Sequence, residues 1–122
     1  MAEEYIVLIV EEPWDPTAVT EEQWQTAMRA HQGFAEAVDK AGAKILGGDA
    51  LQPPSTAVRI TPGNGTGTGP VFTDGPFADT KEIVTGYYKL ATTDANQARE
   101  LAALCPSGGY VDLYPVMSVD QA

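Results

Sequence analysis

The stretch Tyr5-Ile6-Val7-Leu8-Ile9-Val10 decides how this chain folds. Its six consecutive apolar residues are rich in β-branched side chains, and the run ends at Glu11-Glu12-Pro13. A short, continuous apolar run that stops at turn residues is typical of a strand buried on both faces. We therefore expect a strand over residues 5–10 near the middle of a sheet, with apolar side chains on both sides.

A long amphipathic helix is expected next, over residues 21–41. Thr20 and Gln23 stand three residues apart in a capping-box pattern, and Gly42 suits the position just past a helix C-terminus. Side chains at spacings of three and four form one stripe: Trp24, Met28, His31, Ala35 and Val38. This stripe is expected to face the sheet.

Local patterns predict six further elements. Strands are expected over residues 43–48, 56–61, 70–73, 83–90 and 110–116, and a second helix over residues 94–105. The glycine-rich residues 62–69 predict a hairpin tip without a phosphate-binding pattern. The order β-α-β-(β-β)-β-α-β indicates an α+β, ferredoxin-like sandwich: a mostly antiparallel sheet with two helices on one face and an extra hairpin. Because two helices cover only one face, we expect a homodimer that packs through the other sheet faces.

Composition narrows the class of protein. A chain of 122 residues suits a single domain over residues 1–122, and 17 acids against 7 bases leave a net charge of −10. Such a charge repels nucleic acid phosphates and anionic lipids, so we expect no direct nucleic acid and no membrane partner. The sequence shows no apolar run of the ~20 residues that a membrane helix needs and no signal peptide, which favours a cytoplasmic location. Cys105 is the single cysteine, so no internal disulfide is expected.

The segment from Thr73 to Glu82 is the strongest candidate for a functional loop. Asp74-Gly75-Pro76 is a turn signal, and ionisable side chains follow it between two expected strands. A solvated connector is the alternative interpretation. The segment resembles the signature of the YCII-related family, in its DGPF subgroup. Residues 47–54, 86–88, 105–106 and 111–117 resemble further segments of that subgroup in the same order, so the resemblance spans nearly the whole chain.

The resemblance implies a fold of the dimeric α/β-barrel type and a His–Asp pair as the active site, with the histidine on the first helix. His31 is the single histidine here, and an imidazole is well matched to proton transfer near neutral pH. From its spacing alone, His31 fits better as a partly buried structural residue, hydrogen-bonded through one ring nitrogen, and it is the resemblance that raises it as a site residue. Its expected carboxylate partner is Asp74 or Asp49, and the resemblance favours Asp74, which belongs to the family's motif.

Four further residues are candidate ligand contacts: Lys81, Glu82, Tyr87 and Phe77. Lys81 would offer positive charge to an anionic ligand, whereas an ordinary charged strand entrance is the alternative. Tyr87 and Tyr88 are expected on opposite faces of a strand, one in the core and one able to line a cleft. The chain has no second histidine and no EF-hand spacing, so we expect no metal and no cofactor.

Two functions remain open at this point. The first is a small, cofactor-free enzyme that uses His31 and a carboxylate for lyase-type acid–base chemistry on a small cyclic or aromatic molecule. The second, which the resemblance implies, is a non-catalytic dimeric accessory module linked to sigma-factor-dependent transcription through protein contacts.

Overall fold

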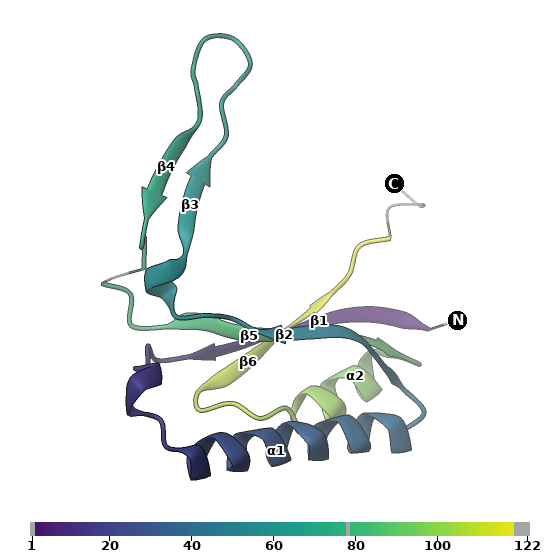
Figure 1. Ribbon diagram of the computed structural model, residues 1–122. Coiled ribbons are helices and arrows are strands. Elements are labelled where there is room, and N and C mark those ends of the chain that lie inside the picture. The colour runs from purple at the N-terminus through teal and green to yellow at the C-terminus, as the bar shows by residue number, and fades with distance from the viewer. Residues whose placement is uncertain (1, 78, 119–122) are drawn as a thin grey trace.

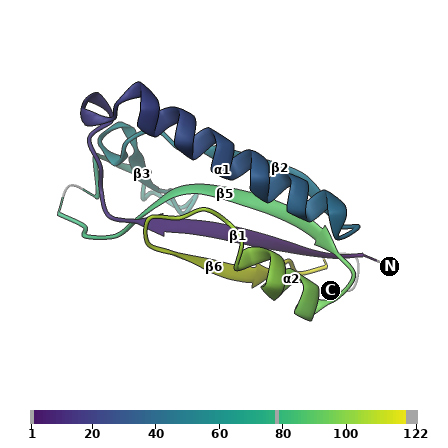
Figure 2. The same cartoon turned by 90° about the horizontal axis from the view of Figure 1, so that it is seen from below.

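The structure is a computed structural model that describes residues 2–77 and 79–118. Within them, one four-stranded sheet has the order β2 (Lys44–Ala50), β5 (Ile83–Thr92), β1 (Glu3–Glu11) and β6 (Tyr110–Pro115). Every neighbouring pair in this sheet is antiparallel. The helices α1 (Glu21–Lys40) and α2 (Ala95–Ala102) lie on the same face of it (Figures 1 and 2).

A separate hairpin of β3 (Val58–Thr61) and β4 (Val71–Asp74) rises from the opposite side of the sheet, as Figure 1 shows. We call this hairpin the arm. The four-stranded sheet with its two helices confirms the predicted α+β, ferredoxin-like fold. The central place of β1, between β5 and β6, also agrees with the sequence-based expectation.

The two faces of the sheet differ in burial. We call the face under the helices the covered face and the opposite one the open face. Val7 and Leu90 are fully buried on the covered face, together with Phe34 and Val38 of α1. Ile6 and Leu8, which alternate with these positions along β1, are half-buried on the open face. Within one chain, therefore, the apolar run of β1 is buried more deeply on the covered face, and Val10, 8% exposed at the end of the run, is the buried exception among the alternate positions.

The apolar stripe of α1 is buried only in its C-terminal half. Of the stripe residues only Val38 is buried, together with Phe34 beside the stripe, whereas Ala35 is exposed and Trp24 and Met28 remain 47% and 60% exposed. The sheet offers little side-chain volume beneath the N-terminal half, because Gly48 and Gly86 lie on the covered face there. The N-terminal end of the stripe therefore lies over a cavity rather than in the core.

The helix ends agree closely with the capping signals. Thr20 and Gln23 form the predicted capping box, and Gly42 takes the expected positive φ of 78°. The second helix ends at Ala102 rather than at residue 105. Residues 54–56 form a short 3-10 helix before β3, so this strand begins two residues later than expected.

Two boundary shifts affect candidate site residues. Asp49 lies within β2 rather than after it, and Asp74 is the last residue of β4. Lys81 and Glu82 precede β5, which begins at Ile83, so the alternation of a strand does not apply to them.

Candidate functional site

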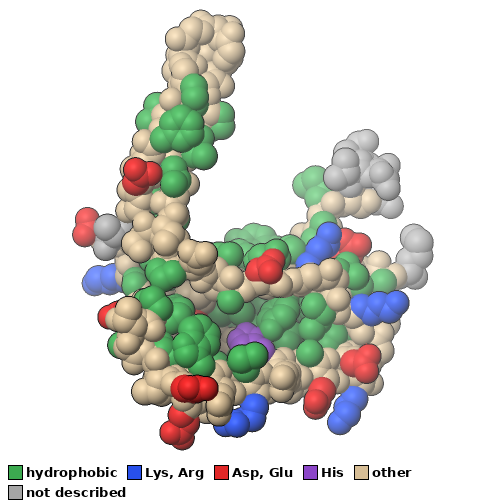
Figure 3. Space-filling view, in the orientation of Figure 1, with side chains coloured by type: hydrophobic (Ala, Val, Ile, Leu, Met, Phe, Trp, Pro, Cys, Tyr) green, Lys and Arg blue, Asp and Glu red, His purple; other side chains and the backbone are tan. Residues whose placement is uncertain are grey.

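A cavity of about 580 Å³ opens between the N-terminal half of α1 and the covered face of the sheet. The helix contributes Gln23, Trp24, Ala27 and His31, and the loop after β1 contributes Trp14. Figure 3 shows the purple imidazole, which only His31 can supply, in a hollow flanked by hydrophobic side chains. The sequence-based candidate His31 thus lies at the wall of a space that a small molecule can enter.

His31 is held by a tyrosine. Its Nδ1 lies 2.6 Å from the hydroxyl oxygen of Tyr88, and the Tyr88 ring packs on Phe34 with 4.9 Å between centroids. Gly48 makes room for this ring, because a Cβ at position 48 would lie 2.6 Å from Tyr88 Cδ1. The tyrosine hydroxyl is therefore positioned by packing from both the helix and the neighbouring strand.

The second ring nitrogen of His31, Nε2, has no hydrogen-bond partner among the described residues. Those residues also contain no buried side-chain nitrogen or oxygen without a partner, so Nε2 has access to solvent. Burial raises the pKa of Tyr88, with a smaller contribution from Cys105, so its hydroxyl keeps its proton at neutral pH. A neutral imidazole whose Nδ1–H donates to Tyr88 presents a lone pair on Nε2, whereas the other tautomer presents an N–H.

Glu11 is a site residue that the sequence reasoning missed. Its carboxylate accepts hydrogen bonds from the Thr85 hydroxyl and, at 2.6 Å, from the Gly108 N–H, and it lines the same cavity. These partners lie 74 and 97 residues away along the chain. The available signal was its position at the end of a buried strand, where the sheet ends and a loop begins.

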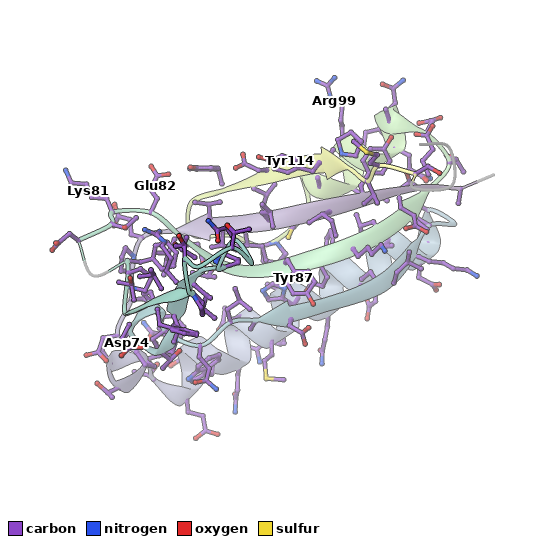
Figure 4. All side chains as sticks on the ribbon, turned by 90° about the horizontal axis from the view of Figure 1, so that it is seen from above. Asp74, Lys81, Glu82, Tyr87, Arg99 and Tyr114 are labelled. Atoms are coloured by element: carbon purple, nitrogen blue, oxygen red, sulfur yellow. The ribbon has the colours of Figure 1, made fainter. Side chains whose placement is uncertain are left out.

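Asp49 and Tyr87 pair with each other rather than with His31. The Tyr87 hydroxyl donates to Asp49 Oδ2 at 2.7 Å, which raises the pKa of Tyr87. Tyr87 lies on the open face, which Figure 4 views, whereas Tyr88 is the tyrosine directed to the cavity. The predicted split of the two tyrosines is present: both belong to the lining of the His31 cavity, but it is the Tyr88 hydroxyl that reaches His31.

Asp74 lies at the edge of a neighbouring hollow, with Trp14, Gly75 and Phe77. Gly75 has the positive φ that the turn signal predicted, and its N–H donates to the Ala57 carbonyl at 2.8 Å. Among the described residues, no hydrogen bond or salt bridge joins His31 to a carboxylate. The hydrogen bond expected from Asp74 or Asp49 is replaced by that of Tyr88, because β5 places its hydroxyl directly under α1.

The remaining candidates lie near the base of the arm. Phe77 and Glu82 line a second cavity there, and Glu82 accepts a hydrogen bond from the Tyr110 hydroxyl. Lys81 is exposed and points away from the sheet in Figure 4. The structure therefore places Phe77 and Glu82 at one cavity and His31 at another, whose lining also includes Asp49 and Tyr87 although these two side chains pair with each other.

No group of three or more His, Cys, Asp or Glu side chains in residues 2–77 and 79–118 is arranged to hold a metal ion. Neither described helix combines the length and the apolar character that crossing a bilayer requires.

The fold and its cavity define a ferredoxin-like α+β domain in which a histidine of the first helix lines the cavity. The chain matches the family model of the YCII-related domain over residues 4–120 and belongs to that family. No protein of described function in the curated collections matches it.

Proposed function

We propose that the cavity beside His31 is the active site of a small enzyme that performs acid–base chemistry without a cofactor. The observation that carries this proposal is the imidazole itself, fixed through Nδ1 by Tyr88 and accessible at Nε2. Because the imidazole is already held in one orientation with one accessible nitrogen, little entropy is lost in orienting it for reaction, which favours proton transfer. The same arrangement suits a lyase-type reaction on a small ring molecule.

The charge of the cavity wall indicates the substrate class. No lysine or arginine is among the described residues that line it, whereas two acids are: Glu11, with both carboxylate oxygens held by donors, and Asp49, which accepts from Tyr87. Trp14 and Trp24 add an aromatic wall, with their rings edge to face at 5.8 Å. We therefore expect a neutral or cationic ring compound, because an anion would meet negative charge without a compensating cation.

The proposed reaction is an elimination. Nε2 of His31 takes a proton from a carbon of the substrate, and the electron pair of that C–H bond forms a double bond as a group leaves the neighbouring carbon. The imidazolium then returns its proton to the leaving group, so the enzyme is unchanged at the end. Tyr88 orients the ring, and Glu11 holds a donor group of the substrate.

Deuterium uptake tests the proposal without knowledge of the natural substrate. In D₂O, the protein is incubated with a panel of neutral and cationic ring compounds that carry acidified C–H bonds, and exchange is followed by NMR. His31→Gln should slow any protein-dependent exchange by ~10²–10⁴-fold, as expected for the loss of a general base. Tyr114→Phe, an exposed tyrosine of β6 that lines neither cavity, is the matched control and should leave the rate unchanged. Exchange that persists in His31→Gln would refute the assignment.

We also propose that the chain belongs to the DGPF subgroup, because it carries Asp74-Gly75-Pro76-Phe77.

We propose further that two copies of the chain pair through their open faces. Tyr110 and Tyr114 of β6 are 47% and 56% exposed on the open side, and no described helix covers them. Light scattering should give twice the single-chain mass of 12.9 kDa, whereas the single-chain mass at micromolar concentration would contradict pairing.

The alternative function, a non-catalytic accessory module, requires a protein partner and no turnover. Deuterium exchange that depends on His31 would therefore exclude it.

A further inference from the structure

A second cavity, of about 680 Å³, lies where the base of the arm meets the start of β5. Leu51, Pro54 and Val84 give it apolar walls, and Arg59, Phe77 and Glu82 add a cation, an aromatic ring and an acid. Its volume falls within the range of small-molecule sites, ~300–1,000 Å³. The cavity shares Leu51 and Gln52 with the wall of the His31 cavity and is otherwise formed by different residues.

Arg59 is the feature that points to a ligand. Its guanidinium lies over the Phe77 ring, 5.2 Å from the centroid, so the aromatic face restricts its position. The described residues place no carboxylate within salt-bridge distance of it. Arg59 is exposed and lines the cavity, so its guanidinium is open to a ligand that enters there.

We propose that this cavity binds a small monocarboxylic acid with a flat apolar body. The planar guanidinium matches the two oxygens of a carboxylate, and the apolar walls accept a ring or short chain. Glu82 lies in the same wall, so a doubly charged group such as a phosphate monoester meets repulsion there. The two cavities are thus expected to select opposite charges, with acids bound beside Arg59 and neutral or cationic compounds beside His31.

The experiment uses benzoate as the probe, with ¹H–¹⁵N and methyl NMR spectra of the full chain as the readout. Saturable shifts are expected for the Arg59 side chain and for Val84, while the His31 signals stay in place. Benzyl alcohol, which lacks the charge, and phthalate, which adds a second one, should each bind at least ten times more weakly.

Two matched variants separate charge from fold. Arg59→Gln should weaken benzoate binding at least tenfold, whereas Arg29→Gln, an exposed arginine on α1, should leave it unchanged. Phe77→Leu should weaken binding by a smaller factor, because the guanidinium remains but loses its aromatic support. Equal affinity in Arg59→Gln, equal affinity for benzyl alcohol, or no saturable shift at millimolar benzoate would overturn the proposal. Signals that move with protein dilution but not with benzoate would assign the groove to a second copy of the chain and also overturn it.

Discussion

The covered and open faces of the sheet are built from the same strands, yet neighbouring residues on them have different roles. Tyr88 packs under α1 and bonds His31, whereas Tyr87, the residue before it, bonds Asp49 on the open face. Leu90 is fully buried on the covered face, whereas Leu8 of β1 is half-buried on the open one. The comparison shows that position relative to α1, rather than residue type, decides which side chains form the core and the cavity.

The largest difference between the faces should appear in stability. Leu90→Ala removes a fully buried side chain and is expected to lower the free energy of unfolding by about 2–5 kcal/mol. Leu8→Ala makes the same chemical change at a half-buried position and should cost clearly less in a single chain. Urea denaturation measures both losses.

Protein concentration sharpens this comparison. If two chains pair through their open faces, the loss of unfolding free energy caused by Leu8→Ala should increase with protein concentration, because the partner chain then buries this leucine. Leu90→Ala and Leu8→Ala should differ in their loss of unfolding free energy at a concentration where the protein is a monomer. Equal losses there would contradict the difference in burial between the two faces.

Two adjacent glycines give the next test. A methyl group at Gly48 would lie 2.6 Å from the Tyr88 ring, whereas at Gly47 it meets nothing within 4 Å. Gly48→Ala should therefore cost about 1–3 kcal/mol of unfolding free energy through overpacking and displace the Tyr88 hydroxyl from His31. Gly47→Ala, the matched control, should unfold within about 0.5 kcal/mol of the wild type. Thermal unfolding of the two variants checks this, and equal losses would show that Tyr88 is not packed against β2.

The smallest effect is confined to alkaline pH. Burial raises the pKa of the Cys105 thiol to about 11 from an ordinary value of 9.0, and the nearby Glu11 carboxylate adds to the rise. Between pH 9 and 11 the thiol is ionised in the unfolded chain but still protonated in the folded one, so the free energy of unfolding falls as the pH rises through this range. Below pH 9 the thiol is protonated in both states, and its ionisation does not change the stability. The stability difference between wild type and Cys105→Ala, measured by denaturation from pH 8 to 11, should change with this sign. A difference that stays constant over that range would contradict the burial of the thiol.

The elements of the fold could be predicted because their signals are local. The capping box at Thr20, the positive φ at Gly42 and the N-cap at Asp94 all depend on residues within a few positions. The apolar run of β1 similarly indicated a central strand without knowledge of its neighbours.

The site was predicted only in part, because its contacts depend on strand register. Alternation showed that Tyr87 and Tyr88 point to opposite faces, but only the pairing of Val7 with Tyr88 places the second under α1. Glu11 reaches Thr85 and Gly108 across the sheet, and no local pattern in the sequence reports such a contact. His31 was found because it is the single imidazole of the chain.

The central claim is that Tyr88, and not a carboxylate, holds His31 at the cavity wall. With one histidine in the chain, its two ring nitrogens can be observed by ¹⁵N NMR without ambiguity. Spectra of wild type, Tyr88→Phe and Tyr87→Phe at one pH report the hydrogen bond at Nδ1. We predict that Tyr88→Phe shifts the Nδ1 resonance and changes the tautomer ratio, while Tyr87→Phe matches the wild type. An unchanged spectrum in Tyr88→Phe, or the same change in both variants, would contradict the claim.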